Sequence, residues 1–126
     1  MGKKVVAAVA LVGVIALSYL SFKWWPHSGV FSTARFDQTQ WLAKVPDQLD
    51  STCYRGNMAY DIRDRVLRSG MAAQEVLDLL GRPDFHSPTE FRYVLGMCSG
   101  LGFDYDDLHV FFNPQGRVER VSVIQH

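Results

Sequence analysis

The sequence predicts an α+β domain in which two helices pack on one face of a three-stranded antiparallel sheet, preceded by a single N-terminal transmembrane helix. Three observations predict this class. An uncharged apolar run lies near the N-terminus, the middle of the chain has apolar residues at helical spacing, and its last third alternates apolar and polar residues. Helices followed by strands in this order favour two layers, with the helices segregated to one face of an antiparallel sheet.

The apolar run covers residues 5–22, which are uncharged and mostly Val, Ala, Leu and Ile. Eighteen residues lie at the lower end of what crosses a hydrocarbon core of about 30 Å as a helix. At its end, Lys23, Trp24 and Trp25 are residue types that anchor a helix at a membrane interface. The two lysines before the run form the more positive flank. They predict a cytoplasmic N-terminus and a domain on the far side of the membrane.

A cleaved signal peptide is the alternative to an uncleaved anchor. In that interpretation Ala16-Leu17-Ser18 provides an A-x-small cleavage site after a shorter apolar stretch. The uncleaved anchor is favoured because the apolar run continues past this site through Phe22. No cysteine ends the run, so a lipoprotein-type lipid anchor is excluded. Both interpretations place the domain outside the cytoplasm.

Three segments follow from this reading. They are residues 1–25 as the anchor or signal peptide, 26–54 as a linker with a possible short helix, and 55–126 as the domain. In the linker, residues 36–42 suit a short helix with Asp37 as its N-cap and Trp41 docked on the core. Residues 27–126 carry ten basic and thirteen acidic side chains, a net charge of −3. This balance excludes a nucleic-acid interface, which needs a basic stripe.

The first helix of the domain is predicted from Asn57 to Ser69, because apolar residues recur every fourth position from Met58 to Val66. Asn57 is the expected N-cap and Gly70 the expected C′ residue. The acid-before-base pairs on its outer side contribute only ~0.2–0.5 kcal/mol each and indicate a solvated helix face. These pairs are Asp61 with Arg65 and Asp64 with Arg68.

A second helix is predicted over residues 72–80, ended by Gly81-Arg82-Pro83. Beyond it the apolar period changes to two, which predicts strands at Phe91–Leu95, Leu108–Phe112 and Arg117–Ile124. Asn113-Pro114-Gln115-Gly116 is a strong turn signal between the last two. The valines of the third strand do not keep one parity, so we expect a bulge or burial on both faces.

The run from Gly70-Met71 through Glu75-Val76-Leu77 to Leu79-Leu80-Gly81-Arg82-Pro83-Asp84 resembles the signature of BamE (SmpA/OmlA) and BLIP-like domains. The likeness extends over roughly residues 55–124. It departs from the family at Ala72, where the family usually has a Ser or Thr N-cap worth about 1 kcal/mol. Because the signature consists of turn and core residues, the resemblance implies a fold and says little about a site.

Cys53 and Cys98 are the only cysteines, an even pair in a compartment that permits disulfides. We predict a disulfide between them, with two buried free thiols or a metal pair as alternatives. On the chain-entropy model, closing a loop of about 46 residues contributes at most roughly 4 kcal/mol.

No catalytic residue, metal site or cofactor is predicted. The histidines have no metal-ligand spacing; they are His27, His86, His109 and His126. Asp104, Asp106 and Asp107, with Asp84, lack the spacing of a calcium-binding EF-hand and are interpreted as a solvated acidic loop. Neither a nucleophile elbow nor a phosphate-binding glycine loop is present in the sequence.

Two places are candidates for partner contacts. Leu101 and Phe103 are apolar tips of a glycine-rich loop. Tyr93, Phe111 and His109 would form an exposed aromatic patch on the open face of the sheet.

The function expected from these features is a non-enzymatic, membrane-tethered binding or scaffold module of the periplasm. The resemblance to BamE implies support of a cell-envelope assembly through an envelope protein partner. An apolar helix in place of a lipid favours a single-pass protein of the bacterial inner membrane, or a secreted periplasmic protein if the leader is cleaved. The alternative is an inhibitor or ligand-sensing domain of the BLIP-like type. An enzyme is least favoured, and no small-molecule substrate is identified.

Overall fold

The structure, a computed structural model, describes residues 2–24, 34–99 and 104–126, with only the backbone of residues 21–24. Three residues with predicted roles lie outside this range: Trp25, Leu101 and Phe103. Lys23 and Trp24 end the first helix, and their side chains are not described.

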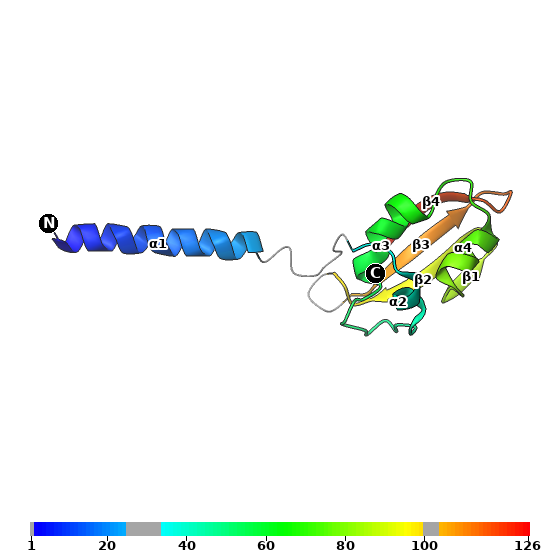
Figure 1. Cartoon of the computed structure of the whole chain (residues 1–126), viewed down its shortest axis with the longest axis horizontal. Coiled ribbons are helices and arrows are strands. Elements are labelled where there is room, and N and C mark those ends of the chain that lie inside the picture. The colour runs from blue at the N-terminus through cyan, green and yellow to red at the C-terminus, as the bar shows by residue number, and fades with distance from the viewer. Residues whose placement is uncertain (1, 25–33, 100–103) are drawn as a thin grey trace.

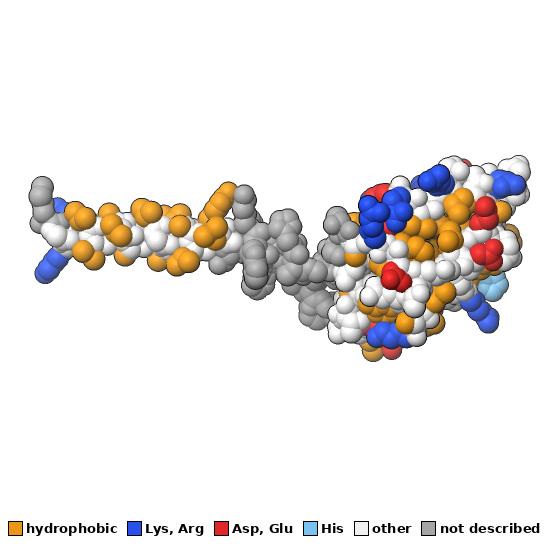
Figure 2. All heavy atoms as spheres, in the orientation of Figure 1, with side chains coloured by type: hydrophobic (Ala, Val, Ile, Leu, Met, Phe, Trp, Pro, Cys, Tyr) orange, Lys and Arg blue, Asp and Glu red, His pale blue; other side chains and the backbone are white. Residues whose placement is uncertain are grey.

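Helix α1 (Gly2–Trp24) contains the apolar run in 23 residues. Every side chain from residue 2 to residue 20 is exposed, so the described part of the domain does not cover this stretch. Figure 2 shows apolar side chains along its length and lysines near its N-terminal end. The segment Gly2–Leu20 is long and apolar enough to cross a membrane, and its N-terminal position also suits a signal sequence. Its 19 residues extend roughly 28 Å, close to the thickness of a hydrocarbon core.

Four antiparallel strands form one sheet in the order β1-β2-β3-β4. They are β1 (Phe85–Ser87), β2 (Glu90–Gly96), β3 (Asp106–Phe112) and β4 (Val118–Gln125). The last three are the predicted strands, and β1 is an addition that the prediction of three strands missed. It has 3 residues, too few to display alternation, and pairs with β2 across the short turn at Pro88-Thr89.

The helices of the domain lie over one face of this sheet (Figure 1). They are α2 (Gln38–Leu42), α3 (Gly56–Asp61), its π-helical continuation η2 (Ile62–Val66), and α4 (Ala73–Leu80). Their apolar side chains meet the inward side chains of the strands in one core. Large members of this core that are fully buried include Trp41, Tyr93, Met58 and Ile62. The α+β class with helices on one face is therefore confirmed, with one more strand and a further short helix.

The first predicted helix is shorter than its apolar stripe suggested. It begins at Gly56, and Arg55, not Asn57, occupies the N-cap position. Its last turn is π-helical, and the Leu67 amide donates to the carbonyl of Ile62 five residues back (2.9 Å). Leu67 then turns to an extended conformation, which ends the helix before residue 69.

Gly70 was predicted to be the C′ residue of this helix. That prediction is wrong, because Gly70 belongs to the turn that follows the helix. It has a φ of +91°, and its amide donates to the carbonyl of Val118 on β4 (2.7 Å). The early end of the helix also explains the ion pairs. Asp61 and Arg65 pair as predicted (2.6 Å). Asp64 contacts its neighbour Arg63 (2.6 Å), because Arg68 lies beyond the last helical turn.

Helix α4 matches its prediction closely. Gly81 ends it with a φ of +77°, and the Gly81 amide donates to the carbonyl of Leu77 (2.8 Å). At the other end, Ala72 is in the extended N-cap conformation but has no side-chain acceptor. The Glu75 carboxylate accepts from the Ala72 amide (2.7 Å), so one half of a capping box is present.

Helix α2 fixes the preceding segment to the domain. Asp37 is its N-cap, as predicted, and accepts from the Gln40 amide (3.0 Å). The Trp41 indole is fully buried, and its Nε1 donates to the carbonyl of Leu80 (2.9 Å). Arg55 is also buried; its guanidinium lies over the Trp41 ring and donates to the Trp41 carbonyl. Residues 34–54 thus belong to the folded unit, although the sequence placed them in a linker.

The last hairpin contains the expected bulge. Phe111 is opposite Arg120 and Phe112 is opposite Val118, so one extra residue lies on β4 between them. The turn before β4 is closed by Asn113, whose side-chain oxygen accepts from the Arg117 amide (3.0 Å).

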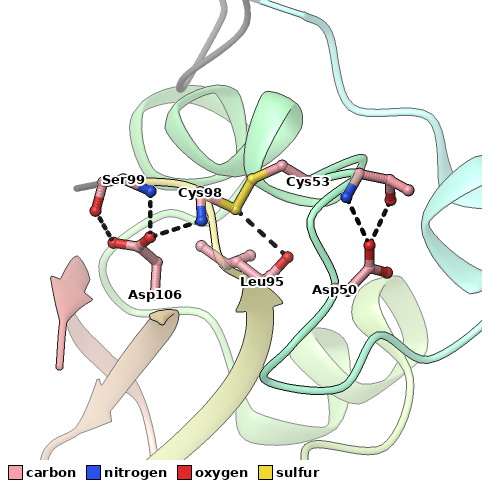
Figure 3. The surroundings of a disulfide bond; sticks show 7 residues. Asp50, Cys53, Leu95, Cys98, Ser99 and Asp106 are labelled. Atoms are coloured by element: carbon pink, nitrogen blue, oxygen red, sulfur yellow. Dashed lines mark hydrogen bonds between the residues drawn. A yellow bond between two sulfur atoms is a disulfide. The ribbon is translucent and has the colours of Figure 1, made fainter. Parts of the chain in front are cut away.

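Cys53 and Cys98 form the predicted disulfide, which joins the segment before α3 to the segment after β2 (Figure 3). Their Cα atoms are 5.3 Å apart. Asp106 orders the Cys98 side of this link: its carboxylate accepts from the amides of Cys98 (3.1 Å) and Ser99 (2.8 Å) and from the Ser99 hydroxyl (2.6 Å). Asp106 is buried, which corrects its assignment to a solvated acidic loop.

Candidate functional site on the outer face of the sheet

Strand β3 divides its side chains between two faces. Leu108, Val110 and Phe112 point into the core beneath the helices. The alternate residues Asp107 and His109 therefore point to the opposite face, here called the outer face. Both are nonetheless nearly inaccessible to solvent, with 5% and 3% of their surface exposed. The domain thus buries polar side chains on the face of the sheet that no described helix covers.

Three side chains of the outer face converge on one point. The Asp107 Oδ2 atom lies 3.2 Å from His126 Nε2 and 3.9 Å from His109 Nε2. The two imidazole nitrogens lie 3.4 Å apart. All three residues present atoms of types that ligate metal ions, and these atoms lie within 4.8 Å of one another. We call this group the Asp-His-His cluster.

His126 reaches the cluster because β3 and β4 pair to their ends. Asp106 is opposite Gln125, and beyond that pair the His126 amide donates to the carbonyl of Tyr105 (2.8 Å). The His126 ring stacks on the Tyr105 ring, with centroids 4.8 Å apart and planes 19° from parallel. The backbone bond and the stack together hold the imidazole over β3.

A second carboxylate orients His109 from the neighbouring strand. Glu90 on β2 contacts His109 Nδ1 with its Oε1 atom (2.5 Å). Arg92 donates to both carboxylate oxygens of Glu90 (3.0 and 3.1 Å). The bonds from Arg92, together with the contact with His109, lower the pKa of Glu90. An ionised Glu90 holds the proton of His109 on Nδ1 and leaves Nε2 facing the cluster.

Asp107 is desolvated and only partly paired. Burial raises the pKa of this carboxyl, although the nearby imidazoles oppose the rise. Its Oδ1 atom is buried and has no hydrogen-bond partner among the described residues. A buried carboxylate oxygen without a partner costs free energy, so this site favours an added donor or cation.

Beside the cluster, the outer face has an aromatic and cationic strip. The ring of Phe111 stacks on His109 at a centroid distance of 5.8 Å. The Arg120 guanidinium lies over the Phe111 ring at 4.1 Å. Aromatic and arginine side chains of this kind are enriched at the energetic centres of protein interfaces.

The structure separates the three residues predicted to form one aromatic patch. Phe111 and His109 share the outer face, but Tyr93 points to the opposite side and is fully buried in the core. Its hydroxyl donates to the Gly81 carbonyl (2.9 Å), and burial raises its pKa. The prediction that Tyr93 belongs to an exposed patch is therefore wrong, because odd-numbered residues of β2 pack inward whereas those of β3 pack outward. His109 is on the predicted face but is only 3% exposed, so its predicted exposure is wrong as well.

The cluster was not predicted, because its three residues do not have a metal-ligand spacing along the chain. Asp107 and His109 are two residues apart on one strand, which places them on one face, and this signal was available. His126 joins them only through the pairing of β3 with β4. Asp107, like Asp106, is buried and does not belong to a solvated loop.

The helix-covered side has a shallow groove of different character. Val66, Met71 and Leu79 form its apolar part, and Arg65 and Arg68 lie among its polar lining. Figure 2 shows the mixture of apolar and charged side chains on this side of the domain.

No protein-family model matches the chain, and a sequence search found no match among curated proteins. The likeness to BamE rests only on residues of the chain itself, chiefly those between Gly70 and Asp84.

Proposed function

We propose that this protein is a membrane-tethered, non-enzymatic binding module of the bacterial periplasm that supports an envelope assembly through contacts with a protein partner. The observation that carries the proposal is the combination of an exposed apolar helix with a disulfide-linked domain. An apolar helix of this length suits a bilayer, and structural disulfides persist in oxidising compartments outside the cytoplasm. The two features are independent and favour the same location.

The orientation follows from charge. Lys3 and Lys4 precede the apolar run, and the positive flank of such a helix stays in the cytoplasm. The domain then lies in the periplasm, tethered to the inner membrane. The resemblance to BamE, a family whose members serve envelope assembly, supports the scaffold role without identifying the partner.

The outer face is the surface proposed for the partner. Arg120 and Phe111 form an arginine–aromatic pair on it, and none of the described helices covers this face. Such pairs supply binding free energy when a partner excludes water from them. The same arrangement would serve the alternative function, in which the face inhibits an enzyme or senses a ligand.

Topology is tested first. In cells producing the full chain, we expect both cysteines to resist alkylation until a reductant is added, and the protein to remain in the membrane after alkaline extraction. The domain should be digested by protease added to spheroplasts. Reduced cysteines in a protease-protected domain would exclude the proposed location. Release of a shortened chain into the periplasm would show that the apolar run is a cleaved signal peptide and not a membrane tether.

Partner contact is tested by a photoreactive amino acid placed at Arg120, with a matched probe at Asp64 on the helix side. We expect a reproducible adduct with a membrane or envelope protein from position 120 and none from 64. Equal labelling from both positions, or recovery of the chain alone, would contradict a partner site on the outer face. An adduct with an enzyme whose activity falls on binding would favour the inhibitor alternative.

A further inference from the structure

We propose that Asp107, His109 and His126 form a binding site for a divalent transition-metal ion of the zinc type. The inference goes beyond the proposed function and does not depend on it, because it rests on the geometry of three side chains. A module without a protein partner could still bind the ion, and a module with a partner could lack it.

The separations of the donor atoms match the requirements of zinc. A tetrahedral zinc ion with bonds of about 2.0–2.2 Å places its ligand atoms roughly 3.3–3.6 Å apart. The separations in the cluster are 3.2, 3.4 and 3.9 Å. A point equidistant from the three atoms lies about 2 Å from each, which is a zinc–ligand bond length. The three donor atoms are therefore close enough together to bind one ion.

One of the two imidazoles has the supporting contact that is typical of a metal ligand. His109 contacts Glu90 through Nδ1 and presents Nε2 to the cluster. A carboxylate behind a ligating histidine is a recurrent arrangement in zinc sites, where it fixes the tautomer and strengthens the ligand. Arg92 in turn holds Glu90, so the supporting interactions form a continuous chain across β2 and β3.

The carboxylate supplies the second, independent observation. The side chain of Asp107 is 8% exposed, its Oδ2 atom lies near both imidazoles, and its Oδ1 atom has no hydrogen-bond partner among the described residues. An anionic group in this position lowers its free energy when a cation binds it. The other two ligands are neutral imidazoles in the metal-bound form, so the site carries the negative charge that a divalent ion needs.

The donor set selects the class of metal. Two nitrogens and one oxygen suit zinc and neighbouring transition metals, whereas Mg²⁺ and Ca²⁺ require oxygen ligands. Both cysteines are engaged in the disulfide, so no thiolate competes. Three protein ligands leave one tetrahedral position for water or for a side chain of a partner. Without a metal, the same residues would form an ordinary hydrogen-bond network, which is the competing outcome of the test.

The experiment uses the full chain in detergent, without a polyhistidine tag and after treatment with a chelator. Zn²⁺ is titrated by calorimetry, and Co²⁺ is added in parallel to observe the visible absorption of a tetrahedral nitrogen–oxygen site. We expect one equivalent to bind saturably. The substitutions His126→Ala and His109→Ala should each weaken Zn²⁺ binding at least about tenfold and remove the Co²⁺ band. Glu90→Gln should weaken binding roughly 10–100-fold, as supporting carboxylates do elsewhere.

His86→Ala is the matched control, because His86 is exposed and lies on β1 outside the cluster. It should bind Zn²⁺ like the unmodified chain. His126→Ala should not unfold the domain, because the His126 side chain is 31% exposed and follows the last strand. Loss of binding in this variant can therefore be separated from misfolding. Unchanged circular dichroism in His126→Ala, together with lost binding, would support the site. Absence of saturable Zn²⁺ binding, or equal weakening by His86→Ala and His126→Ala, would overturn it.

Discussion

Gly56 shows how a single residue can be required by a covalent link. It is the first residue of α3, and a Cβ added there would lie 2.6 Å from the sulfur atoms of both Cys53 and Cys98. Bonded sulfurs cannot move away as the end of a flexible side chain can. The helix therefore approaches the disulfide as closely as it does because residue 56 has no side chain.

Gly56→Ala should lower the free energy of unfolding by about 1–3 kcal/mol, the usual result of overpacking a tight contact. Urea denaturation measures the change. The matched background is the double variant Cys53→Ala/Cys98→Ala, in which the sulfurs are absent and the penalty should largely disappear. An equal loss in both backgrounds would show that the disulfide is not the cause.

Asp61 is the residue whose titration most directly affects stability. The Arg65 guanidinium and then the Phe36 amide donate to its carboxylate (2.6–2.8 Å), and they lower its pKa from 3.8 to about 2. A carboxyl whose pKa is lower in the folded state stabilises the fold above its unfolded pKa. This stabilisation is lost as the pH falls from about 4 towards 2.

Asp61→Asn should therefore lower the free energy of unfolding by about 1 kcal/mol at pH 7, and the difference from the unmodified chain should shrink between about pH 4 and pH 2 and vanish below the folded-state pKa. Urea denaturation at a series of pH values measures this. Asp64→Asn is the control, since Asp64 is exposed and its ion pair in the described structure is with its sequence neighbour Arg63. A pH-independent difference at position 61 would contradict the assigned cause.

Among the elements, α4 has an N-terminus that can be improved. Ala72 has the extended backbone of an N-cap (φ −71°, ψ 150°), and Glu75 already bonds to its amide. The missing half of the capping box is a side-chain acceptor at residue 72. Ala72→Ser should raise the free energy of unfolding by roughly 1 kcal/mol.

Thermal denaturation would measure this gain. Ala73→Ser, one residue inside the helix, is the control and should be neutral or slightly destabilising. No gain at position 72, or the same gain at both positions, would show that the cap is not what limits α4.

The elements also show which parts of the fold can be predicted from local sequence patterns. The α4 helix and strands β2, β3 and β4 were predictable because each contains a full apolar period. Strand β1 was not, since its 3 residues are stabilised by pairing with β2 and not by their own pattern. The π-helical turn η2 was missed for a related reason. Its apolar residues keep helical spacing, while the extended Leu67 and the contact of the following turn with β4 end the helix early.

For the whole molecule, α2 determines where the domain begins. The Trp41 ring packs edge-on against Phe36 and Tyr93, with centroids 6.3 and 6.0 Å away. Its indole is fully buried and bonded to the end of α4. The segment between the apolar helix and α3 is therefore part of the core, and a tethered domain that lacked it would lose its largest buried side chain.

Trp41→Ala should lower the free energy of unfolding by about 3–5 kcal/mol, which would leave a domain of this size marginally folded. Leu42→Ala is the control. Because Leu42 is 48% exposed, its substitution should lower the free energy of unfolding far less. Chemical denaturation followed by circular dichroism distinguishes the two. If both substitutions lowered the free energy of unfolding by the same small amount, α2 would not be part of the core.

The sequence by itself determined the apolar helix, the α+β class and the hairpin turn, because each depends on residues that are close in the chain. It favoured a bond between the two cysteines, and the structure decided between that bond and free thiols or a metal pair. The sequence did not determine which side chains share the outer face. His126 is 17 residues from His109, and strand register alone brings them together. Tyr93 is a second residue whose face of the sheet the sequence did not determine. A strand alternates its faces, but only packing against the helices decides which face is buried.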